Sequence, residues 1–155
     1  MQMINVANPA APTLFSTNTL YGANGTEIII IGTTAYLATS PDIAELMIFN
    51  VSNPLAVTLI GYRDEPGTDD GNSVAGYGTT IFLGMLTTGN FEAIDASVLP
   101  FPPALGTYNA TDDIRDIALG VGDTLAFLAT DDNPMEFQIV DISNPSSLSL
   151  YGSAN

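Results

Sequence analysis

An internal repeat of about 45 residues constrains the fold of this chain more than any other feature. An Asn or Asp that closes an apolar segment recurs at positions 5, 50, 95 and 141, in steps of 45, 45 and 46 residues. A second marker, an aromatic residue inside an apolar segment, recurs in phase with the first at Tyr36, Phe82 and Phe127. Two independent markers with one period indicate that the chain is built from repeated structural units.

Each unit contains four short segments rich in β-branched and aromatic residues, which favour β-strands. Gly32 and Gly122 predict tight turns between the first and second segments, because glycine tolerates a positive φ. No window keeps a helical periodicity over three turns. The predicted strands are 27–31, 34–39, 45–51, 57–62, 73–77, 80–85, 91–96, 104–108, 114–121, 124–130, 136–142 and 148–151, preceded by 3–6 and 13–16.

Four-stranded units of about 40 to 50 residues are typical of β-propeller blades. A β-solenoid and a run of immunoglobulin-like modules are the alternatives, but solenoid turns are usually shorter and immunoglobulin modules about twice as long. The sequence therefore predicts an all-β fold and a single propeller segment. We expect a half blade at 1–18 and three whole blades at 19–64, 65–110 and 111–155.

The third unit resembles the LVIVD-repeat family. The family pattern of an aromatic-Val-Ala segment, an Ile-Ile-Asp-Val-Ser-Asn-Pro segment and a Gly-x-Tyr ending stands here at 126–129, 137–145 and 148–152. Its Arg-Asp pair matches Arg115-Asp116, whereas 97–103 of the second unit departs from Ser-Asn-Pro and predicts a different outer turn. The resemblance covers essentially the whole chain and implies a propeller, frequent export or surface attachment, and no shared enzymatic activity.

The charge of the chain excludes several classes of partner. It has 17 Asp and Glu against two cations, Arg63 and Arg115, which gives a net charge of −15. Such a charge repels nucleic acid and anionic membranes and attracts divalent cations or basic partners. There is no cysteine or histidine, so disulfides, thiolates and imidazole bases are excluded. No apolar run is long enough to span a membrane.

The location predicted from composition and resemblance is extracellular or the cell surface. The first five residues have neither the basic region nor the apolar region of a signal peptide. We therefore expect any export signal to lie upstream of this sequence.

Polar residues recur near the start of each predicted innermost strand, at Glu27, Ser73 and Asp116, with Arg115 beside the last. In a propeller these positions lie near the mouth of the central channel, where many propellers bind ligands. The first interpretation is that Asp116 and Arg115 satisfy each other or neighbouring backbone groups, and the second is a ligand site. A carboxylate-dependent hydrolase is the last alternative, and we assign no catalytic residue.

Acidic loops suggest calcium as the one candidate cofactor. Asp64, Asp69 and Asp70 lie in the segment that joins the first two whole units, and Asp131 and Asp132 lie between strands of the third. Calcium prefers six to eight hard oxygen ligands from such loops. No loop follows the calcium-binding pattern with its trailing Glu, so solvated turn residues are the alternative interpretation.

Closure of the ring raises the question of partners. Two strands and three blades amount to three and a half blades, and propellers usually close with four or more. An open arc would expose apolar blade faces. We therefore expect a homo-oligomer or the remainder of a longer propeller to complete the ring. The predicted function is a non-catalytic surface interaction or scaffold module with a protein or glycan partner, and the alternative is a propeller that binds a small ligand or calcium.

Overall fold

The computed structural model describes residues 1–40, 44–131 and 134–155, and the described residues form fourteen strands and no helix. Every pairing between neighbouring strands is antiparallel, so the prediction of an all-β fold is confirmed. No helix that could cross a membrane occurs in this part of the chain. The strands are β1 (Gln2–Asn5), β2 (Thr13–Thr17), β3 (Asn24–Ile31), β4 (Thr34–Ser40), β5 (Leu46–Asn50), β6 (Thr58–Arg63), β7 (Asp70–Tyr77), β8 (Thr80–Leu86), β9 (Asn90–Asp95), β10 (Ala104–Asn109), β11 (Ile114–Leu119), β12 (Leu125–Thr130), β13 (Phe137–Asp141) and β14 (Ser149–Ala154).

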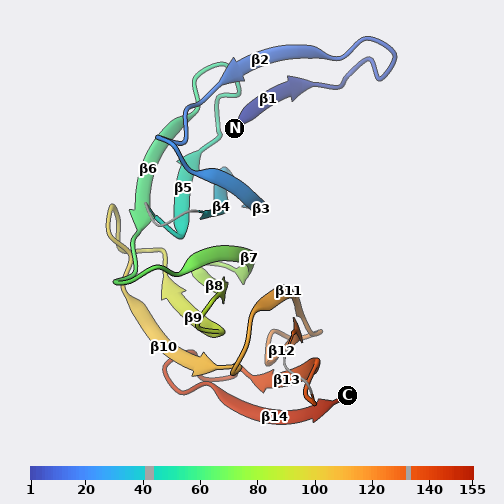
Figure 1. The fold of residues 1–155 in the computed structure, drawn as a ribbon. Coiled ribbons are helices and arrows are strands. Elements are labelled where there is room, and N and C mark those ends of the chain that lie inside the picture. The colour runs from blue at the N-terminus through green and yellow to red at the C-terminus, as the bar shows by residue number, and fades with distance from the viewer. Residues whose placement is uncertain (41–43, 132–133) are drawn as a thin grey trace.

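The strands form one hairpin, β1-β2, and three four-stranded sheets in sequential order. Blade 1 is β3 to β6, blade 2 is β7 to β10 and blade 3 is β11 to β14. The blades follow one another along an arc that does not close into a ring, with the chain ends at its opposite ends (Figure 1). The innermost strands β3, β7 and β11 line the concave side of this arc (Figure 1). The prediction of propeller blades is therefore confirmed.

Two innermost strands begin earlier than the sequence predicted. β3 starts at Asn24 and β7 at Asp70. The register of each ladder shifts once, between Gly25 and Glu27 and between Gly71 and Ser73. A bulge of this kind leaves one residue unpaired while pairing continues on both sides, which a strict two-residue alternation does not anticipate. The other predicted strand ends differ from the observed ones by a few residues at most, as at Leu119.

The apolar core lies between neighbouring units, not within them. Each blade has a front face, which we define as the face toward the preceding unit, and a back face toward the following unit. Because side chains alternate along a strand, Ile94 packs on the front of β9 against blade 1 while Ala93 packs on its back against blade 3. Both side chains are fully buried. A third cluster lies between β1 and the front face of blade 1.

The outer turn of blade 2, residues 97–103, packs on the outer strand of blade 1. The amide of Tyr62 donates a hydrogen bond to the carbonyl of Pro100 at 3.0 Å. A Cβ at Gly61 would lie 2.7 Å from a methyl carbon of Leu99, so the close approach needs glycine there. This turn thereby places exposed apolar side chains, among them Phe101, on the outer rim of the arc.

Candidate functional site

The three aligned residues Glu27, Ser73 and Asp116 occupy the same register position, next to the bulge of each innermost strand. Glu27 reaches across to the next blade, where its Oε2 accepts a hydrogen bond of 2.7 Å from the amide of Val74. The carboxylate of Glu27 therefore connects the innermost strands of blades 1 and 2. This is a backbone-satisfying role, of the kind that the sequence left open for Asp116 and Arg115.

The other two aligned residues have different surroundings. Ser73 is 1% exposed, and its Oγ has no hydrogen-bond partner among the described residues. A Cβ at Gly84 would lie 2.5 Å from that Oγ, so the hydroxyl lies against the backbone of the neighbouring strand. Asp116 is exposed, and its carboxylate accepts from the amide of Ile117 at 2.9 Å. The structure thus aligns the three residues along the concave side without bringing their polar atoms together.

The surroundings of Glu27 and Ser73 predict different effects on stability for the two alanine substitutions. Glu27→Ala removes the acceptor for a part-buried amide and should lower the free energy of unfolding by about 1–3 kcal/mol. Ser73→Ala removes a buried hydroxyl that has no partner in the described part of the chain, and it should leave that free energy unchanged or raise it by up to about 1 kcal/mol. Urea unfolding followed by circular dichroism measures both. If Ser73→Ala lowered the free energy of unfolding as much as Glu27→Ala, the hydrogen bonding described for these two residues would be contradicted.

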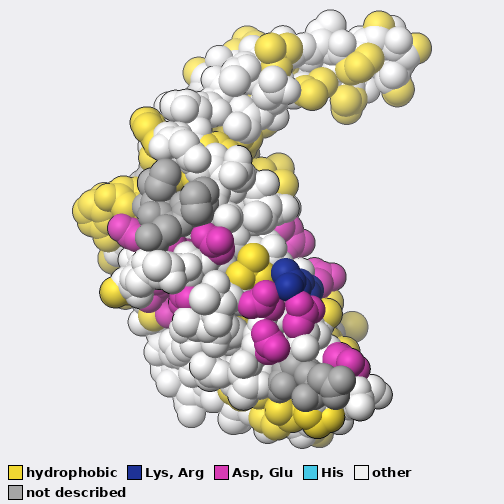
Figure 2. Space-filling view, viewed as in Figure 1, with side chains coloured by type: hydrophobic (Ala, Val, Ile, Leu, Met, Phe, Trp, Pro, Cys, Tyr) yellow, Lys and Arg dark blue, Asp and Glu magenta, His cyan; other side chains and the backbone are white. Residues whose placement is uncertain are grey.

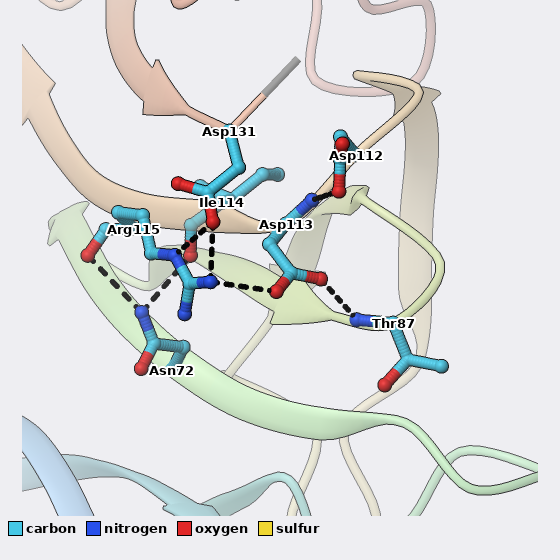
Figure 3. A network of polar contacts seen from close by, with 7 residues as sticks. All are labelled: Asn72, Thr87, Asp112, Asp113, Ile114, Arg115 and Asp131. Atoms are coloured by element: carbon cyan, nitrogen blue, oxygen red, sulfur yellow. Dashed lines mark hydrogen bonds and ion pairs between the residues drawn. The ribbon is translucent and has the colours of Figure 1, made fainter.

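Arg115 is held in a network at the junction of blades 2 and 3 (Figure 3). Its Nε donates to Asp131 at 2.9 Å and its Nη2 donates to Asp113 at 2.9 Å. The other oxygen of Asp113 accepts from the amide of Thr87 in blade 2 at 2.6 Å. The Nδ2 of Asn72 completes the network by donating to the carbonyl of Arg115 at 3.1 Å. The hydrogen bond from Arg115 holds the pKa of the Asp131 carboxyl below its usual range.

Arg63 is the centre of a second network, at the junction of blades 1 and 2, which the sequence did not single out. Its Nε donates to Oε2 of Glu92 in blade 2 at 2.9 Å, and its Nη2 pairs with Glu65. Its Nη1 donates to the carbonyl of Pro102 at 3.1 Å. Burial and the negative charge of Glu92 raise the pKa of Glu65, against the opposing effect of Arg63. The one available signal was that Arg63 is one of only two cations in the chain.

The carboxylates suggested as calcium ligands are dispersed. Asp69 is 6% exposed and accepts a hydrogen bond from the hydroxyl of Thr88 at 2.7 Å. Asp64 is exposed just after β6, Asp70 begins β7, and Asp131 is paired with Arg115. No three acidic side chains in the described part of the chain are arranged to hold a metal ion. Asp132 lies outside the described residues, and calcium binding stays a prediction.

Two hollows open on the outer rim of the arc, with volumes of about 340 Å³ and about 320 Å³. Both are lined by Tyr62 and Asp64. The first continues along Arg63 to the outer turn of blade 2, where the rings of Phe101 and Tyr62 form a T-shaped pair with a centroid distance of 5.2 Å. The second lies on the front side of blade 1. Neither was predicted, and the walls of the first come from two separate units of the repeat. The second hollow is lined by Tyr21, Ala44, Met47, Leu59, Tyr62 and Asp64.

The back face of blade 3 repeats an interface side that is buried elsewhere in the chain. In blade 2 the rings of Phe82 and Phe91 stack at 5.4 Å, and both are 0% exposed under blade 3. The corresponding rings of Phe127 and Phe137 in blade 3 stack at 6.0 Å, but Phe137 is 41% exposed. The same packing motif therefore occurs in blades 2 and 3, but in the described structure only the copy in blade 2 is covered by a following blade.

The front face at the other end of the arc is also uncovered. Ile4 in the β1-β2 hairpin is 52% exposed, whereas its repeat counterparts Phe49, Ile94 and Val140 are all 0% exposed. Ile28 of β3 is 46% exposed. In Figure 2 hydrophobic side chains are visible along the hairpin at one end of the arc and over the opposite end, while acidic side chains surround the visible basic group.

Comparison with known protein families agrees with the repeat. Residues 122–155 match the family model described as the LVIVD repeat. The match spans β12, β13 and β14, the second to fourth strands of blade 3, together with the turn that precedes them. No curated protein matches the chain.

Proposed function

We propose that this chain, whose residues 122–155 match the LVIVD repeat and whose blades 1 and 2 share the strand order of blade 3, is a non-catalytic interaction module that works at the cell surface or outside the cell. Its contact surfaces are the two uncovered end faces of the arc. Each end face takes a further propeller unit, supplied by a second copy of the chain or by another part of a longer one.

The observation that carries this proposal is the exposure of Phe137. The residues at its repeat position in the other blades, Leu46 and Phe91, are both 0% exposed under the next unit. A stacked aromatic pair that is half uncovered resembles one side of an interface rather than a solvated surface. The front face around Ile4 has the character of the opposite side. A front face and a back face meet in a heterologous contact, which closes into a ring or continues as an open series.

The non-catalytic part of the proposal is supported by the state of the polar candidates. Glu27 is bonded to a backbone amide and Arg115 to two carboxylates, so neither is aimed at a vacant site in the described structure. An exported location is supported by the acidic, lysine-free composition and by the resemblance of the repeat units. A ligand site at the mouth of the channel has no specific observation in its favour, because its three aligned residues do not converge.

Phe137→Asp tests the end face directly. Wild-type protein is expected to elute as a closed oligomer, or as a series that grows with concentration, by light scattering on a sizing column. Phe137→Asp should dissociate that species to a monomer, since it places a charge in the apolar contact. Phe101→Asp is the matched control, because Phe101 is 63% exposed on the outer rim and should leave the mass unchanged. A wild-type protein that remains monomeric and binds no further propeller unit would contradict the proposal.

A further inference from the structure

The hollow on the front side of blade 1 has a distinct chemical layout. Its floor is apolar and formed by Ala44, Met47 and Leu59, and its volume is about 320 Å³. Two tyrosines flank this floor, Tyr21 and Tyr62, which are 64% and 37% exposed. A pocket with an apolar floor, aromatic walls and a few polar groups is the usual form of a recognition site.

An exposed carboxylate, Asp64, completes the lining of this hollow. Asp64 follows Arg63 directly, but the guanidinium of Arg63 is directed at Glu92, Glu65 and Pro102. The charge that Asp64 presents to the hollow is therefore not neutralised by its neighbour. Aromatic faces and a carboxylate together favour a cation.

Equivalent positions of the repeat can be compared at the junctions between blades 1 and 2 and between blades 2 and 3. The side chain at one position of the outer strand reaches forward into the next unit: Arg63 contacts Glu92 in blade 2 at 2.9 Å, and Tyr108 contacts Gln138 in blade 3 at 2.7 Å. Met47 stands at the position of Glu92 and Gln138 in blade 1. Asn18 stands at the position of Arg63 and Tyr108.

The side chain of Asn18 is shorter than those of Arg63 and Tyr108. Its amide donates to the carbonyl of Val57 at 2.8 Å, as Arg63 donates to the corresponding carbonyl of Pro102 at 3.1 Å. The hydrogen bond to a backbone carbonyl is thus shared by Asn18 and Arg63. The rest of the Arg63 side chain has no counterpart in Asn18 at the junction between the β1-β2 hairpin and blade 1. The hollow borders Met47, which stands at the position that Arg63 and Tyr108 contact at the other junctions.

We infer that this hollow binds a lysine or arginine side chain of a partner protein. The aliphatic stem lies on Met47 and Leu59, and the cationic end lies between the tyrosine rings and the carboxylate of Asp64. The inference rests on the proposed function as an interaction module and names the chemistry of its partner at the hollow of blade 1, away from Phe137 in blade 3. The net charge of −15 would also steer a basic partner toward the chain.

The occupant comes from another molecule. The chain contains no lysine, and both of its arginines are in ion pairs with carboxylates. The amino terminus donates to the carbonyl of Asn18. The described structure therefore offers the hollow no cation of its own, and a second copy of the chain would bring none.

Titration of the intact, isotope-labelled protein with an acetylated Gly-Gly-Lys-Gly-Gly amide, followed by NMR, tests the inference. Amide shifts should be largest around Tyr62 and Asp64, and the same peptide with norleucine in place of lysine should not cause them. Asp64→Asn should weaken binding about threefold to fivefold. Asp123→Asn is the matched control, because it removes the same charge from an exposed turn and should leave binding unchanged.

A second variant fills the hollow from within the chain. Asn18→Arg places at the first junction the residue that already bridges the second, and it should abolish the lysine-dependent shifts while Asn18→Ala keeps them. Equal binding of the norleucine peptide, an equal loss in Asp64→Asn and Asp123→Asn, or shifts spread over all acidic loops would each overturn the inference. Failure here leaves the sizing result for Phe137→Asp unaffected, so the two proposals fail separately.

Discussion

Phe91→Ala is expected to lower the free energy of unfolding by about 3–5 kcal/mol, because it removes a fully buried ring and leaves a cavity. Phe91 is 0% exposed and stacks on Phe82 inside the core between blades 2 and 3. The loss therefore falls on the contact that joins two blades rather than on one sheet. Urea unfolding followed by circular dichroism measures the change.

Phe137→Ala is the matched control for this substitution. Phe137 has the same position in the next blade and stacks on Phe127 in the same way, but it is 41% exposed. Its removal should cost about 1 kcal/mol in dilute protein, since the ring leaves a partly solvated place. Equal losses for the two variants at low concentration would show that the back face of blade 3 is covered, contrary to the structure.

Arg63→Met is expected to lower the free energy of unfolding by about 3 kcal/mol, because it leaves Glu92 buried without its cation. The side chain of Glu92 is 6% exposed and that of Arg63 is 16% exposed. Methionine keeps much of the packing of the arginine stem, so the loss reports the charge. Arg115→Met is the matched control at the other junction. It should cost far less, because the side chains of Arg115 and Asp131 are 47% and 46% exposed.

The loss in Arg63→Met should also depend on pH. Burial raises the pKa of Glu65 above its ordinary value of 4.5, and removal of Arg63 takes away the effect that opposes this rise. A carboxyl whose pKa is raised in the folded state stabilises the fold below its unfolded pKa and loses that contribution as the pH rises through the folded pKa. The deficit of Arg63→Met relative to wild type should therefore shrink as the pH falls from 7 toward 4.5. A deficit that stays constant or grows over that range would contradict this account.

The repeat, the all-β fold and the blades could be predicted from the sequence because each depends on local chemistry. Strand alternation, the turn glycines and the Asx residues act over a few residues and recur with one period. Asn50, Asp95 and Asp141 illustrate this, since each accepts a hydrogen bond from the amide two residues onward. A signal that is complete within one unit and repeated in the next can be recognised without knowledge of the packing.

The candidate site could be predicted only as a set of aligned positions. Glu27, Ser73 and Asp116 do stand at one register position, but side-chain length decides what each one does there. Glutamate reaches the amide of the next blade, serine is too short and is buried without a partner among the described residues, and aspartate bonds to the amide that follows it. Alignment predicts the place of a residue in the repeat and does not predict its neighbours.

Sequence alone determined the periodic unit, its strands and its acidic, cysteine-free chemistry, because these are properties of short segments and of composition. Only the tertiary structure decided that Arg63 joins Glu92 and that Phe137 is exposed where Phe91 is buried. Each of these depends on the packing of one sheet against the next. The physical reason is that such contacts join residues about 30 or more positions apart on different blades, where burial is set by the neighbouring unit and not by the residue or its local sequence.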